Sequence, residues 1–143
     1  MKKLNATAEF EAVRRQFLLN KFRRVIATQS QIAIRNAFHA TADAPAPRFW
    51  VSETRAAAIM GKMLAGNDPT PRMNREKKDM FQEIFRRFMK IRVSSPERSI
   101  ADIVFDVVNA PAPKSYISWQ RVKAIIYKEL HRLRRERKEK TCR

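Results

Sequence analysis

The feature that most constrains this chain is a segment that occurs twice. Residues 44–55 read APAPRFWVSETR, and residues 110–121, which lie 66 positions later, read APAPKSYISWQR. At the same offset the similarity continues backward, for example through Phe22 and Phe88. Self-similarity at a fixed period is typical of units that cannot bury their apolar faces alone and pack on one another. The sequence therefore predicts an internal duplication whose two copies pack together.

Length and composition allow one core and indicate an anionic partner. The 143 residues, 44% of them hydrophobic, suffice for one ordinary domain but not for two. The 31 basic residues outnumber the 14 acidic ones, which gives a formal net charge of +17. Such a charge favours a polyanion as partner, and nucleic acid is the first candidate.

We expect neither a membrane partner nor disulfides. The N-terminal residues lack the apolar run of a signal peptide, and no apolar stretch reaches the roughly 18 residues that a membrane span needs. The single cysteine, Cys142, cannot form an intrachain disulfide. These observations favour a reducing compartment and a cytoplasmic location.

The residues before the first proline segment predict two helices. Apolar residues at three- and four-residue steps indicate a helix over 7–27. A second helix is expected over 31–42, capped by Ser30 or Thr28. The side chains expected to face the core are Phe10, Val13, Phe17, Leu18, Phe22, Val25 and Ile26, followed by Ile34, Ala37, Phe38 and Thr41.

The proline segment separates these helices from a third one. Residues 44–47 cannot be helical, because each proline restricts its predecessor to extended geometry and lacks a backbone donor. Ser52 is then expected to cap a helix that ends near Gly66. The first repeat therefore spans residues 7–66, and residues 67–73 link it to the second.

The second repeat, residues 74–131, predicts the same order of elements. Asn74 is expected to cap a helix that ends near Val93, and Ser95–Pro96 to start the next helix. The side chains expected inside are Met80, Phe81, Ile84, Phe85 and Phe88, followed by Ile100, Ile103, Val104, Val107 and Val108. The spacing of the latter group is the strongest helix signal in the chain.

A last helix leads into a basic tail. Ser118 is expected to cap it, with Val122, Ile125, Ile126 and Leu130 inward, and it should continue to about Lys138. Residues 132–143 contain seven cations against two carboxylates, so this tail is solvated or bound to an anion. The predicted fold class is all-α: two tandem three-helix units packed as one domain, with a basic C-terminal helical extension.

The sequence contains no catalytic constellation. His39 and His131 stand alone, without a second histidine or cysteine at metal-ligand spacing, and two glycines do not suffice for a phosphate-binding loop. Asp102 and Asp106 share a helix face, where a solvated pair is favoured over a two-metal nuclease site. We therefore expect no enzymatic activity, no metal and no cofactor.

Each unit, with a helix, a second helix, an extended turn and a capped third helix, resembles a helix-turn-helix. The connection over residues 43–51 departs from that motif, because it has nine residues and no glycine. The chain is also similar to small, basic, uncharacterised proteins of gut anaerobes and their phages. These resemblances imply a regulatory or accessory DNA-binding protein, in the cytoplasm or within a phage particle.

Under this interpretation the third helices contact nucleic acid. An arginine near a helix N-terminus can reach a base edge, and lysines further along meet phosphates. Persistence from the duplication is an alternative explanation for basic residues that recur in both copies. The candidate nucleic-acid-binding residues are Arg55, Lys62, Gln120, Arg121, Lys123, Lys128, Arg132, Arg134 and Arg135.

Other functions remain open at this point. Trp50 and Tyr116 are expected to anchor the turn to the core, although stacking on an unpaired base would indicate RNA or single-stranded DNA. The protein could then be an RNA-binding or nucleoprotein-assembly component, associated with a ribosome or a phage particle. A third class is an α-repeat adaptor for an acidic protein partner.

Overall fold

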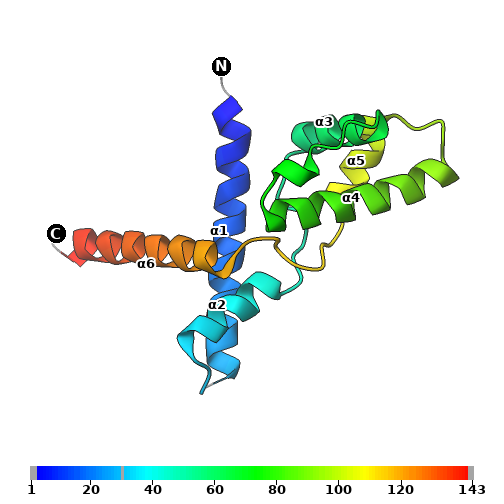
Figure 1. Cartoon of the computed structure of the whole chain (residues 1–143). Helices are drawn as coiled ribbons and strands as arrows, with labels where there is room; N and C mark the ends of the chain where they lie inside the picture. The colour runs from blue at the N-terminus through cyan, green and yellow to red at the C-terminus, as the bar shows by residue number, and fades with distance from the viewer. Residues whose placement is uncertain (1–2, 30, 142–143) are drawn as a thin grey trace.

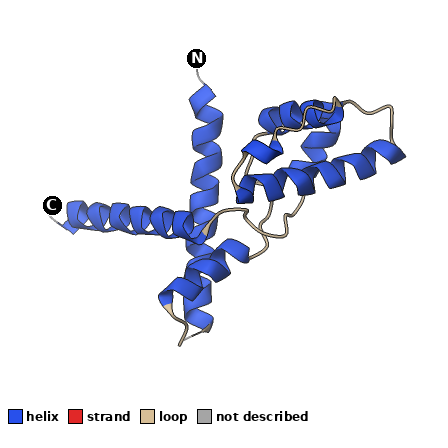
Figure 2. Cartoon of the chain, in the orientation of Figure 1, coloured by secondary structure: helices blue, strands red, loops and turns tan. Residues whose placement is uncertain are grey.

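The protein consists of helices and the loops that join them. The computed structural model describes the backbone of residues 3–29 and 31–141, and the side chains from residue 11 onward within these ranges. Its elements are α1 (Lys3–Thr28), α2 (Ile34–Asp43), α3 (Glu53–Leu64), the short 3₁₀ helix η1 (Thr70–Arg72), α4 (Arg75–Ser94), α5 (Ile100–Val108) and α6 (Trp119–Thr141). The described part of the chain forms no strand (Figure 2), so the predicted all-α class is confirmed.

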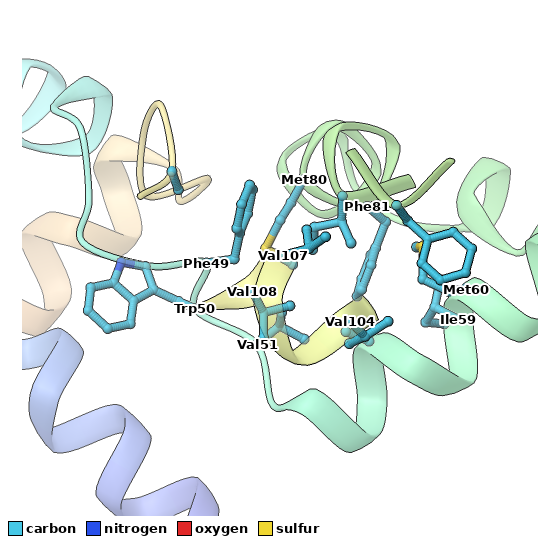
Figure 3. Packing of buried hydrophobic residues seen from close by; sticks show 14 of the residues in the cluster. Phe49, Trp50, Val51, Ile59, Met60, Met80, Phe81, Val104, Val107 and Val108 are labelled. Atoms are coloured by element: carbon cyan, nitrogen blue, oxygen red, sulfur yellow. The ribbon is translucent and has the colours of Figure 1, made fainter. Parts of the chain in front are cut away.

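The helices form two lobes, each with its own core. We call α1, α2 and α6 the terminal lobe and α3, α4 and α5 the central lobe (Figure 1). The core of the terminal lobe contains Leu18, Leu19, Phe22, Ala37, Phe38, Ala42, Val122 and Ile126. The central core contains the buried side chains of α3, α4 and α5, with Phe49, Trp50 and Val51 (Figure 3).

The lobes do not follow the order of the chain, which differs from the predicted tandem arrangement. In the described structure α2 and α3 do not pack against each other, and neither do α5 and α6. Instead α3 packs on α4 and α5, while α6 packs on α1 and α2. The proline-containing segments 44–52 and 110–118 explain the exchange, because an extended connection carries the third helix away from the two helices before it.

Where the two segments cross, they are joined by backbone hydrogen bonds. The Ala46 N–H donates to the Ala112 carbonyl over 3.0 Å, and the Ala112 N–H donates back to Ala46 over 2.9 Å. The Phe49 N–H donates to Val108 over 3.0 Å. A second bond is related to this one by the repeat offset. Ser115, which lies 66 residues after Phe49, donates its N–H over 3.3 Å to the carbonyl of Ala42, which lies 66 residues before Val108. The duplication itself stays a prediction. If the chain is duplicated, the third helix of each repeat packs on the first two helices of the other repeat.

Several predicted helix ends match the structure. The hydroxyl of Ser52 accepts a bond of 3.1 Å from the Arg55 N–H, and that of Ser118 accepts one of 3.2 Å from the Arg121 N–H. Both serines therefore begin helices by satisfying an amide that has no partner within its helix. Asn74 caps α4 in the same way, through the Lys77 N–H. After α3, Gly66 adopts a φ of +86°, the left-handed conformation that suits glycine at a helix end.

Two predicted helix starts are wrong. Helix α2 begins at Ile34 after Ala33, which offers no side-chain cap, while Thr28 belongs to the end of α1 and Ser30 lies outside the described residues. Helix α5 begins at Ile100, with Ser99 as its cap. Ser95 instead ends α4, because its N–H bonds to the carbonyl of Ile91.

The core prediction is correct in part. Trp50 is buried, and its indole N–H donates to the Ser115 hydroxyl over 3.1 Å, so the core role expected of this residue is confirmed. Three residues expected in the core, Val13, Ile26 and Ile34, are between 40% and 53% exposed. Ile26 lies two residues before the end of α1 at Thr28, whereas Val13 lies near the middle of that helix. The side chain of Phe10 and the whole of Cys142 lie outside the described residues.

Candidate nucleic-acid interface

The residues predicted to bind nucleic acid are all exposed, but they do not form two equal surfaces. Arg55 and Lys62 lie on α3 in the central lobe. The others, from Gln120 to Arg135, lie on α6 in the terminal lobe. Because of the exchange of third helices, the candidate site is concentrated on α6 and on the helices that pack against it.

One face of α6 carries regularly spaced cations. Arg121, Lys128 and Arg135 follow one another at intervals of seven residues, which is close to two helical turns. Their side chains therefore share a face and are about 10 Å apart along the helix axis. The C-terminal half of α6 projects away from the body of the protein (Figure 1), so this face is accessible over most of its length.

Helix α1 contributes two further arginines opposite this face. A cleft of about 140 Å³ between α1 and α6 is lined by Glu11, Arg14, Arg15, Arg121, Ala124, Ile125 and Lys128. Four cations and one carboxylate thus face the same space. The sequence places Arg14 and Arg15 on the polar side of α1, but it contains no signal that α6 packs there.

The two α1 arginines differ in their partners. The Arg15 Nε lies 3.0 Å from the Glu129 Oε1 and forms an ion pair with it. Arg14 forms no ion pair with any carboxylate in the described part of the chain. Burial lowers the pKa of Arg14, and the nearby charge of Arg121 lowers it further, whereas Glu11 acts in the opposite direction.

Glu129 is a buried charged residue that the sequence analysis missed. Its side chain is 4% exposed, and both of its carboxylate oxygens accept bonds from Arg132, of 3.1 and 2.6 Å. The bonds from Arg132 lower the pKa of Glu129, burial opposes them, and the charges of Arg132 and Arg15 add to the lowering. The sequence did contain a signal for its burial, because Glu129 lies on the same face of the helix as the apolar Val122 and Ile126.

A second cleft, of about 410 Å³, lies further along α6 and is chemically different. Its lining includes Lys128, Arg132 and Arg135 from the predicted set, and also the carboxylates of Glu129, Glu136 and Glu139. Arg132 binds Glu136 over 2.5 Å in addition to Glu129. Carboxylates therefore offset much of the positive charge in this cleft.

The remaining predicted residues lie apart from these clefts. The Arg55 guanidinium is 5.9 Å from the centre of the Phe81 ring on α4, and Lys123 has its Nζ 5.9 Å from the Tyr127 ring. Gln120 lines a cavity of about 360 Å³ that also contains acidic residues such as Asp43. The structure therefore brings together Arg121 and Lys128 in the first cleft, and Lys128, Arg132 and Arg135 in the second, but not the whole predicted set.

A further polar cluster lies around the start of α5. Arg98 holds both Asp102 and Asp106, at 2.7 and 2.5 Å. No group of three or more potential metal ligands occurs among residues 3–29 and 31–141. Within the same ranges, no helix has the length and apolar character that crossing a bilayer requires.

The arrangement is chemically suited to holding anions. Arginine can bind a phosphate through two parallel hydrogen bonds, and lysine adds a point charge. The cleft between α1 and α6 provides both kinds of cation without an equal number of carboxylates.

The chain matches no protein-family model, no curated protein and no solved structure.

Proposed function

We propose that this protein binds nucleic acid, with duplex DNA as the favoured ligand and α6 as the main contacting element. A regulatory or accessory role, without catalysis, is part of the proposal. The observation that carries it is the cation-lined cleft between α1 and α6, from which the spaced cations of α6 continue outward. Phosphate contacts supply most of the affinity of such proteins.

The distribution of charge supports this choice of surface. The helices of the terminal lobe contain sixteen basic and six acidic residues. Those of the central lobe contain nine basic and six acidic residues. A lobe with such an excess attracts a polyanion over distances of about one Debye length, roughly 8 Å at physiological salt.

The salt dependence of binding tests the proposal. If about six phosphates are contacted, the affinity for a duplex should fall with salt at a log-log slope of roughly −5. Fluorescence anisotropy with a labelled duplex at several salt concentrations measures this slope. A chain that binds no nucleic acid at low salt, but captures an acidic protein, would replace the proposal with the adaptor function.

RNA is the second candidate, and one side chain favours it. Tyr127 on α6 is 50% exposed and lies beside Lys123, so its ring is placed where an unpaired base could stack. Tyr127→Leu should then weaken binding to single-stranded RNA and leave binding to duplex DNA unchanged. Tighter binding to structured RNA than to any duplex would shift the assignment to an RNA-binding or nucleoprotein-assembly component.

A further inference from the structure

Two positions on α1 differ in kind from the positions that lie 66 residues later on α4. On α4 these later positions are occupied by Met80 and Phe81, which are 6% and 1% exposed and belong to the core that α4 shares with α3. On α1 the earlier positions are occupied by Arg14 and Arg15, which face α6. The interface between α1 and α6 therefore carries charged side chains at two positions where the corresponding interface between α4 and α3 carries apolar ones.

Among the described residues, Arg15 forms an ion pair with a carboxylate and Arg14 forms none. Arg15 forms an ion pair with Glu129 of α6. The equivalent position of α3, 66 residues earlier, is occupied by the apolar Met63. Arg14 has no such ion pair among the described residues and lies partly buried beside Arg121, with Glu11 as the one carboxylate that lines the same cleft. Two like charges in a partly desolvated cleft repel each other, and a bound anion would remove that cost.

We propose that the cleft between α1 and α6 holds one phosphate group of a nucleic-acid strand, with Arg14, Arg121 and Lys128 as its ligands. This inference rests on the proposed function and assigns its anchoring phosphate contact. The guanidinium groups of Arg14 and Arg121 can each donate two hydrogen bonds to phosphate oxygens. Lys128, two turns further along α6, adds a third donor to the same cleft.

The cations outside the cleft indicate a strand rather than a free phosphate. Arg135 continues the face of Arg121 and Lys128, so that the cations extend over about 20 Å along α6. A single inorganic ion would need no such extension, whereas successive phosphates of a polymer can use it. Lys128 and Arg135 also line the second cleft on α6, whose three carboxylates take no part in the proposed phosphate contact.

Matched substitutions in the full chain test the inference. Arg14→Gln and Arg121→Gln should each lower the affinity for a labelled duplex about tenfold, because each removes charge-assisted bonds to one phosphate. Arg24→Gln is the control, since Arg24 is exposed on α1 and does not line the cleft. It removes the same charge and should lower the affinity at most about threefold. Equal losses for Arg14→Gln and Arg24→Gln overturn the cleft assignment while leaving the proposed function intact.

Thermal unfolding of the free protein gives a second, independent measurement. Arg14→Gln should raise the melting temperature in chloride, because it removes the repulsion with Arg121. Inorganic phosphate, compared with chloride at equal ionic strength, should raise the melting temperature of the wild type more than that of Arg14→Gln. An equal response of the two proteins to phosphate contradicts the inference. If inorganic phosphate raises the melting temperature but the protein binds no nucleic acid, both this inference and the proposed function are overturned.

Discussion

The two lobes have the same pattern of helix contacts but differ in the side chains that line one of their interfaces. In the central lobe, α3 lies on α4 and α5 over a continuous apolar core (Figure 3). In the terminal lobe, α6 lies on α1 and α2 in the same way, but Arg14 and Arg15 stand on α1 where α4 has Met80 and Phe81. The difference is that the interface between α1 and α6 contains a charged cleft beside its apolar core.

This contrast has an energetic side. Removing apolar surface from water stabilises a fold by roughly 25 cal/mol per Å². The ion pair between Arg15 and Glu129 replaces such packing, and an ion pair must offset the desolvation of both charges before it contributes. We therefore expect the central lobe to supply more of the stability, and the terminal lobe more of the binding.

The exchange of third helices gives the largest expected effect. A separate fragment of residues 67–143 contains α4, α5 and α6, but it lacks the α3 that completes one core and the α1 and α2 that complete the other. At low concentration this fragment should show no cooperative unfolding transition in urea. Circular dichroism during urea titration measures this. A monomeric fragment as stable as the full chain would break the two-lobe description.

The next largest effect compares two equivalent positions. Phe81→Ala should cost about 3 to 5 kcal/mol, because it leaves a cavity in the fully buried core of the central lobe. Arg15→Ala, on the equivalent turn of α1, should cost less than half as much, since the Arg15 side chain is 40% exposed. Urea unfolding of both variants provides the measurement. The opposite order would mean that the charged interface is the more stable one.

Acid should weaken the terminal lobe through Glu129. The pKa of Glu129 lies below its ordinary value of 4.5 in the folded protein, mainly because of the bonds from Arg132. The stability that these bonds contribute is therefore fully present above about pH 4.5 and is lost as the pH falls through the lowered pKa. Glu129→Gln should destabilise the protein by about 1 to 3 kcal/mol at neutral pH.

The pH dependence of this difference separates charge from shape. If the carboxylate acts through its charge, the stability gap between the wild type and Glu129→Gln should close in acid. A gap that stays constant from pH 7 to about pH 3 would show that the variant loses packing instead. Glu136→Gln is a suitable control, because Glu136 is about half exposed.

The smallest effect concerns binding by the two third helices. Arg121 and Arg55 occupy equivalent positions, yet Arg121 lines the cleft and Arg55 lies near the ring of Phe81. Arg121→Ala should weaken binding to a duplex about tenfold, and Arg55→Ala by less than about threefold. Equal losses in an anisotropy titration would instead favour two equivalent binding surfaces, as the helix-turn-helix resemblance implies.

Local signals in the sequence predicted the helices well. The serines at 52 and 118, the asparagine at 74 and the glycine at 66 all mark helix ends in the structure. These signals work because a cap bonds to amides within three residues of itself, so distant residues have little influence on it. Ser95–Pro96 failed because Ser99 offered a competing cap closer to the apolar residues of α5.

The sequence alone determined the order of the helices, most of their ends, the apolar face of α5 and the excess of positive charge. The tertiary structure decided which helices share a core, and so which charges meet. Arg14 and Arg121 come together only because the extended segment 110–118 carries α6 onto α1. Glu129 became a buried ion-pair partner by the same packing. Periodicity reports which face of a helix is apolar, but not which distant helix will cover it.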